Sequence, residues 1–141
     1  MQFDPSIWGE HFWFFLFTVA LSYPLMPNTI TKRKYYDLIQ NLPLFIPHQT
    51  SSDNFSKIID RYPVTPYLDS RDAFVKWIHF IHNKMNDLLG HKQLTLLEAL
   101  NEYNSHYKPK YVKQKEDIKY REKSIFIGIV LLSAIGIYYI Y

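Results

Sequence analysis

The sequence predicts a small all-α domain that is followed by an apolar C-terminal segment. Apolar residues recur at three- and four-residue intervals between 74 and 89, which is the spacing of one buried helix face. Prolines and capping residues divide the preceding chain into segments of helical length. The last 18 residues carry no charged side chain.

Composition limits what the chain can be. Its 141 residues are enough for one domain of roughly 100 to 120 residues, but not for two. Aromatic residues make up 18% of the chain, which fits a compact core with rings left to lie against a planar ligand. There is no cysteine, so disulfide bonds and cysteine-based zinc sites within these residues are excluded. No basic segment precedes an apolar run at the start, so no signal peptide is expected.

The first helix is expected over residues 11–23, where Pro24 ends a strongly apolar run. Apolar side chains on nearly every side predict a central helix of a bundle, because about 13 residues are too few to cross a bilayer. A second helix is expected over 31–42, where Pro43 stops it. A third helix is expected to follow the segment 47–55 and to bury Ile58 and Ile59.

The long fourth helix carries the strongest pattern. Asp69 or Ser70 can cap its N-terminus, and Gly90 is suited to its C-terminal end. Its expected buried face is formed by the apolar residues Phe74, Trp77, Ile78, Ile81, Met85, Leu88 and Leu89. A polar stripe runs beside this face and consists of His79, His82, Asn83 and Asn86. Such a stripe can hold a bound group, and the alternative is a solvated helix face.

The remaining soluble part is short. Thr95 and Glu98 have the spacing of a capping box, which predicts a fifth helix from Thr95 to about Tyr107. A linker follows at 108–123 with seven basic and three acidic residues.

The uncharged stretch 124–141 is just long enough to span a bilayer, and its tyrosines suit the headgroup layer. The basic linker would stay on the cytoplasmic side, which predicts a tail anchor with the N-terminal domain in the cytosol. A buried core helix and a nucleic-acid-binding lysine run are the alternatives. Neither is favoured, and no nucleic acid is expected.

The fourth helix resembles a known signature. Its matching residues are Trp77, His82, Asn83, Asn86, Leu89 and Gly90, followed by His91 or Lys92 as the basic position. In this spacing the chain is similar to the Erv/ALR family of FAD-linked sulfhydryl oxidases, in which the histidine and asparagines hold the flavin and its adenosine part. The resemblance implies FAD as the cofactor, with the basic residue near its phosphates or adenosine. The form of the segment after 94 is most like the compact members from large DNA viruses.

The first helix is also similar to that family. The matching residues are Trp8, Gly9, Trp13, Leu16, Thr18, Tyr23 and Pro24. Phe17 stands where the family has a flavin-contacting histidine. An aromatic ring can still stack there, but the hydrogen bond of the histidine is lost.

The active-site position departs from the family. After Pro47, His48 and Ser51 stand where the family has its Cys-x-x-Cys pair. That chemistry needs sulfur, because one thiolate exchanges with the substrate disulfide and the other adds to the flavin ring. A base and nucleophile pair for hydrolysis is a weaker interpretation, since no orienting acid or oxyanion hole is evident. A metal site of His48, His79 and His82 lacks a recognisable ligand spacing, so no metal is expected.

The resemblance implies a four-helix bundle with a short fifth helix over 1–107, ahead of the linker and the transmembrane tail. The expected function is that of a membrane-anchored, flavin-binding pseudoenzyme or scaffold. One alternative is an active thiol oxidase whose cysteines have been replaced deliberately, and another is a tail-anchored helical adaptor without flavin. The expected partners are a host or virion membrane, a second copy of the chain, and a protein that exchanges thiols and disulfides.

Overall fold

The computed structural model describes residues 3–140, with side chains through residue 136. The chain divides into two compact units, one ending at Tyr103 and the other beginning at Asn104. The described residues are helical with short connections, so the predicted all-α class is confirmed. Four helices, α1 (Pro5–Leu21), α2 (Thr29–Asn41), α3 (Gln49–Arg61) and α4 (Arg71–Leu88), form the first unit together with most of α5 (Leu96–Ser105). Two short 3-10 helices, η1 (Leu42–Phe45) and η2 (Thr65–Tyr67), lie between them.

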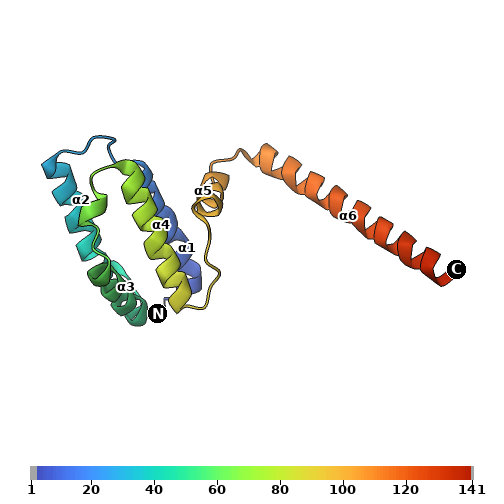
Figure 1. The fold of residues 1–141 in the computed structure, drawn as a ribbon, viewed down its shortest axis with the longest axis horizontal. Coiled ribbons are helices and arrows are strands. Elements are labelled where there is room, and N and C mark those ends of the chain that lie inside the picture. The colour runs from blue at the N-terminus through green and yellow to red at the C-terminus, as the bar shows by residue number, and fades with distance from the viewer. Residues whose placement is uncertain (1–2, 141) are drawn as a thin grey trace. The chain divides into compact units, whose positions relative to one another are not determined.

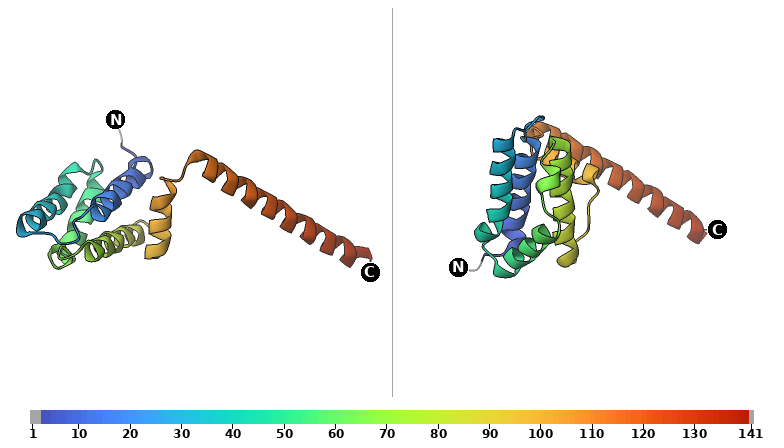
Figure 2. Two further views of the ribbon diagram at one scale, coloured as in Figure 1. Left: turned by 90° about the horizontal axis from the view of Figure 1, so that it is seen from above. Right: turned by 60° about the vertical axis from the view of Figure 1, so that its left-hand side comes forward.

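Helices α1 and α4 lie side by side in both Figure 1 and Figure 2, and α3 also packs against α4. The core between the four helices is apolar. It receives Leu16 from α1, Ile39 from α2, Ile59 from α3 and Ile78 from α4, each at most 1% exposed. The position of the core therefore follows the apolar spacing of α2, α3 and α4.

Tyr23 fastens the end of α1 to its neighbours. Its hydroxyl donates to the Leu68 carbonyl at 2.8 Å, and its own carbonyl accepts from the Arg71 side chain. Its ring meets the rings of Tyr35 and Phe74 edge to face. The segment that leads into α4 is thereby held against α1 and α2.

Side-chain caps set where the helices begin. Asp4 caps α1 and Asn28 caps α2, so α1 starts six residues and α2 two residues earlier than the apolar pattern predicted. Ser70, rather than Asp69, caps α4. Gly90 has a φ of +70°, which a side chain would disfavour, and it follows the end of α4 as predicted.

Two predictions about buried faces are wrong in part. Leu88 and Leu89 are 58% and 45% exposed, at the point where α4 ends. Helix α1 is apolar on nearly every side but is not enclosed by other helices, since Phe15 is 49% exposed. Only one side of α1 faces α4 and the core.

The second unit contains α6 (Lys110–Ile140), a single helix that continues through the predicted linker and into the predicted anchor. Over the residues that are described, none of the helices has the length and apolar character that crossing a bilayer requires. The predicted anchor at 124–141 extends into residues 137–141, which lie outside the part whose side chains are described.

Candidate functional site

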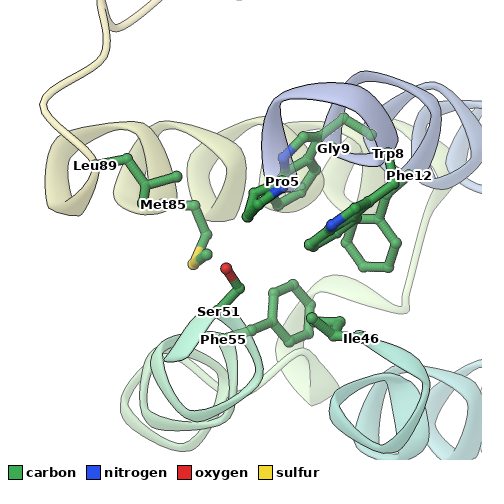
Figure 3. Close-up of a pocket in the computed structure, with 10 residues that line it drawn as sticks. Pro5, Trp8, Gly9, Phe12, Ile46, Ser51, Phe55, Met85 and Leu89 are labelled. Carbon is green, nitrogen blue, oxygen red and sulfur yellow. The ribbon is translucent and has the colours of Figure 1, made fainter. Parts of the chain in front are cut away.

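A cavity lies where α1, α3 and the end of α4 meet, and Figure 3 shows its lining. The cavity is small, with a volume of about 40 Å³, and it is partly open to solvent. The lining residues are Pro5, Trp8, Gly9, Phe12, Trp13, Ile46, Ser51, Phe55, Met85 and Leu89. Most of them are apolar or aromatic, so the cavity suits a flat apolar group.

Aromatic packing holds the walls of the cavity in place. Phe12 is the centre of this packing, because its ring meets Trp8 and Phe55 edge to face with centroids 5.9 Å apart in both pairs. Trp13 lies against Phe12 at 5.5 Å and against Phe55 at 6.3 Å. Gly9 lies beside these rings, and a Cβ atom there would meet nothing within 4 Å. The walls are therefore formed by rigid rings, with open space next to Gly9.

One residue of the cavity lining has a polar atom without a partner. The Nε1 of Trp8 is buried and makes no hydrogen bond within the described part of the chain. A buried N–H without an acceptor costs about 1 to 3 kcal/mol, so such groups are normally satisfied. A ligand that presents an oxygen or nitrogen acceptor would remove this cost.

Ser51 supplies a second polar group from the first turn of α3. Its side chain is 4% exposed, and Figure 3 shows its hydroxyl pointing into the cavity. The Ser51 Oγ lies 2.9 Å from the Nδ1 of His48, which caps α3 by accepting from the Ser51 N–H at 3.3 Å. The two residues predicted at the Cys-x-x-Cys position are therefore in direct contact, and one of them lines the cavity.

His82 lies behind Trp13 rather than in the cavity lining. Its ring stacks on Trp13 at 4.3 Å with an interplanar angle of 19°, and Phe17 meets it edge to face at 6.2 Å. Burial lowers the pKa of His82 from 6.5 to about 4, with smaller contributions from His79 and His91. His82 is therefore neutral near pH 7, and it supports the indole that forms one cavity wall.

Asn83 binds the chain itself. Its Oδ1 accepts from the Leu94 N–H at 3.0 Å, and its Nδ2 donates to the Leu94 carbonyl at 2.8 Å. The Nε2 of His79 also contacts the Leu94 carbonyl at 2.8 Å. This part of the predicted ligand-holding stripe fastens the connection between α4 and α5.

Asn86 continues the same contact. It is 9% exposed, and its Nδ2 donates to the Lys92 carbonyl at 3.3 Å. Its backbone carbonyl accepts from the His91 N–H at 2.8 Å. The side chains of His91 and Lys92 are exposed, and the Lys92 Nζ pairs with Glu98 at 3.2 Å. The structure places these residues along one connection rather than around the cavity.

Trp77 and Phe17 belong to the core. Trp77 is 1% exposed, and its Nε1 donates to the Tyr62 carbonyl at 3.0 Å, which ties α4 to the end of α3. Phe17 is 4% exposed and contacts His82. Neither lines the cavity, and their part in ligand binding stays a prediction.

Of the predicted site residues, the structure brings Trp8, Gly9, Trp13 and Ser51 together around the cavity. Phe12 and Pro5 were not predicted, although they recur with Trp8 and Gly9 at the three- and four-residue spacing of one helix face. Ile46 and Met85 were also missed, because nothing local in the sequence separates them from ordinary core residues. Among the residues that are described, no group of three potential metal ligands is formed.

The chain is similar in sequence to known FAD-linked sulfhydryl oxidases. Residues 10–119 match the Erv1/Alr family. The chain is 34% identical over 108 residues to a "Probable FAD-linked sulfhydryl oxidase" of Acanthamoeba polyphaga mimivirus, and the match covers 76% of each chain. It is 27% identical over 87 residues to the "Mitochondrial FAD-linked sulfhydryl oxidase erv1" of Schizosaccharomyces pombe, covering 62% of this chain and 48% of that one.

A solved structure agrees in fold. The "FAD binding domain of Erv1 from Saccharomyces cerevisiae" superposes with a TM-score of 0.64 at 24% identity. The match covers 76% of this chain and 96% of that domain. At this identity the likeness shows the helical architecture.

Proposed function

This chain belongs to the Erv1/Alr family, and from that premise we propose that it binds FAD in the cavity between α1, α3 and α4 without performing dithiol oxidation through its own residues. FAD, when bound, would supply a two-electron acceptor. The cavity residues would bind and orient its ring system. The proposal thus separates the cofactor site, whose residues fit the group, from the thiol chemistry, whose residues are absent.

The observation that carries the cofactor proposal is the unpartnered N–H of Trp8. Trp8 is one of the residues that line the aromatic-walled cavity. A flavin ring is planar and carries carbonyl oxygens and ring nitrogens at its edge, so it can stack on these walls and accept from the indole. The donor set on this cavity therefore fits a flavin.

The residues at the redox position do not fit the dithiol reaction. The chain contains no cysteine, and His48 and Ser51 occupy the position of the pair. A serine hydroxyl is far too weakly acidic to exchange with a disulfide, and an imidazole has no disulfide-forming state. The side chains of Ser51 and His48 instead make a hydrogen bond to each other. We expect the chain to hold the cofactor without oxidising thiols.

Flavin binding is tested on the purified full chain by its absorbance at about 450 nm, before and after incubation with FAD. A Trp8→Phe variant keeps an aromatic ring but removes the N–H, and we expect it to bind FAD about five- to tenfold more weakly. Tyr36→Phe is the control, because it removes a polar group from an exposed aromatic side chain outside the cavity. If the full chain takes up no FAD, the proposal is wrong, and a helical adaptor without flavin becomes the better interpretation.

The redox part is tested separately by oxygen uptake with dithiothreitol as the electron donor. We expect no enzymatic uptake from the unchanged chain, and a measurable rate after His48→Cys and Ser51→Cys are combined. Each single substitution serves as the control, because one thiol cannot form the disulfide. Oxygen uptake by the unchanged chain at an enzymatic rate would contradict the argument from missing sulfur.

We also propose the partners that the sequence predicts. Exposed apolar side chains on α1, Ile7 and Phe15, leave a surface that a second copy of the chain could cover. A protein that carries its own dithiol would have to supply any thiols that reach the flavin. Sedimentation of the purified chain tests whether a second copy binds. The uncharged run at 124–141 supports the third partner, a membrane that this run would enter as an anchor.

A further inference from the structure

The hydrogen bond between Ser51 and His48 has a defined direction. The Nδ1 of His48 lies 3.3 Å from the Ser51 N–H, which can only donate, so Nδ1 carries a lone pair rather than a hydrogen. The same Nδ1 lies 2.9 Å from the Ser51 Oγ. The Ser51 hydroxyl must therefore donate its hydrogen to His48, and the imidazole carries its hydrogen on Nε2.

This direction decides what Ser51 offers to the cavity. A hydroxyl has one hydrogen and two lone pairs, and the hydrogen of Ser51 is used by His48. The Ser51 Oγ therefore presents lone pairs to the cavity and acts there as an acceptor. The Trp8 Nε1, in contrast, can only donate. Of these two lining residues, Trp8 therefore supplies a donor and Ser51 an acceptor.

We propose that Ser51, held by His48, is a specificity-determining residue that favours a ligand edge bearing an N–H, and hence reduced FAD over oxidised FAD. The proposal rests on the proposed function, because it takes FAD as the ligand and residue 51 as the residue beside its reactive ring.

The preference follows from the chemistry of the two flavin states. The oxidised ring has a lone pair at N5, which would face the lone pairs of Ser51. Reduction by two electrons and two protons, for example by dithionite, places a hydrogen on N5 and another on N1. The N5–H can donate to an oxygen that is already oriented as an acceptor. One hydrogen bond of this kind corresponds to a factor of about three to ten in affinity.

The test measures binding of oxidised and of reduced FAD to the full chain, the latter under anaerobic dithionite. Ser51→Ala is expected to lower the ratio of the two affinities by about three- to tenfold, which lowers the two-electron midpoint potential of the bound flavin by about 15 to 30 mV. Ser52→Ala is the matched control, because its hydroxyl donates to the Pro43 carbonyl rather than lining the cavity. The ratio is expected to stay unchanged in that variant.

Two variants of His48 separate the direction of the bond from general damage. His48→Asn keeps an acceptor oxygen at the cap and is expected to preserve the ratio. His48→Ala frees the Ser51 hydroxyl to donate into the cavity, so the ratio is expected to fall.

The outcomes also separate this inference from the proposed function. Absence of binding in both flavin states overturns both. Normal binding with an unchanged or increased ratio in Ser51→Ala overturns the inference alone, because Ser51 would then be silent or a donor.

Discussion

His82 is an imidazole packed between Trp13 and Phe17, and its burial makes the stability of the fold depend on pH. Its pKa is about 4 in the folded chain against an ordinary value of 6.5. Between these pH values the unfolded chain binds a proton at His82 that the folded chain does not bind. The contribution of His82 to the free energy of unfolding is therefore fully present above pH 6.5 and is lost as the pH falls towards 4. We expect a loss of roughly 2 to 3 kcal/mol between about pH 7.5 and about pH 4.5 from this residue.

Urea unfolding at these two pH values measures the effect. His82→Phe keeps an aromatic ring but has no proton to bind, so the difference in unfolding free energy between the two pH values should shrink by that amount. Ile78→Val is the control, because it costs about 1 kcal/mol at both pH values and removes no ionisable group. An undiminished difference in His82→Phe would mean that the imidazole is protonated while folded.

At the scale of single residues, the sequence identified side chains better than it identified their contacts. Trp8, Gly9, Trp13 and Ser51 border the cavity as a matching motif suggests. Asn83 shares a helix face with polar neighbours, but its amide pairs with the backbone of Leu94, a residue 11 positions away. Helical spacing predicts which residues share a face, but it does not predict which segment of the chain will pack against that face.

At the scale of elements, the connection between α4 and α5 depends on Asn83. Its amide accepts from the Leu94 N–H and donates to the Leu94 carbonyl, so both backbone polar groups of Leu94 are hydrogen-bonded. We expect Asn83→Ala to destabilise the fold by about 1 to 3 kcal/mol, because it removes both bonds from a partly buried backbone. We also expect the Leu94 amide to exchange its hydrogen faster, which hydrogen-exchange NMR measures directly.

Asn83→Asp sharpens this test. The carboxylate can still accept from the Leu94 N–H, but it cannot donate to the Leu94 carbonyl, which its second oxygen would face. We therefore expect the Leu94 amide to be less protected from exchange than in the unchanged chain. Asn101→Ala on the exposed face of α5 is the control and should change neither stability nor exchange at Leu94. Equal protection of Leu94 in all three variants would show that α5 holds the connection without Asn83.

Helix ends show why element boundaries were only partly predictable. The Thr95 and Glu98 capping box is formed in both directions, with the Thr95 N–H donating to Glu98 at 2.7 Å and the Glu98 N–H donating to Thr95 at 3.2 Å. Its start was predicted because both partners are close in sequence. Asp4 caps a helix whose first turn is less apolar than the segment that follows, so the apolar pattern placed that start too late. Asn28 caps α2 two residues before the predicted start.

At the scale of the whole molecule, the fold class followed from periodicity, while the bundle and its cofactor came from resemblance to a family. The apolar spacing of α4 predicted its core contacts through Met85. The sequence of α1 could not reveal that Phe15 is exposed, because a helix that is apolar on nearly every side does not indicate which side faces the core. The cavity also escaped prediction as a whole, since it is assembled from separate helices and from the segment that precedes α3.

The uncharged run at 124–141 is the proposed membrane anchor. Within the described part of this run, Phe126 and Leu132 are 67% and 71% exposed, and the run carries no charge. We expect the full chain, expressed in cells, to remain with membranes in alkaline carbonate, and a chain ending at residue 123 to be released. Two lysines at the middle, Ile129→Lys with Leu132→Lys, should also release it, because each charge costs about 2.5 to 3.5 kcal/mol at the centre of a bilayer. Tyr120→Lys adds a charge outside the run and should leave the chain bound, whereas extraction of the unchanged chain would refute the anchor.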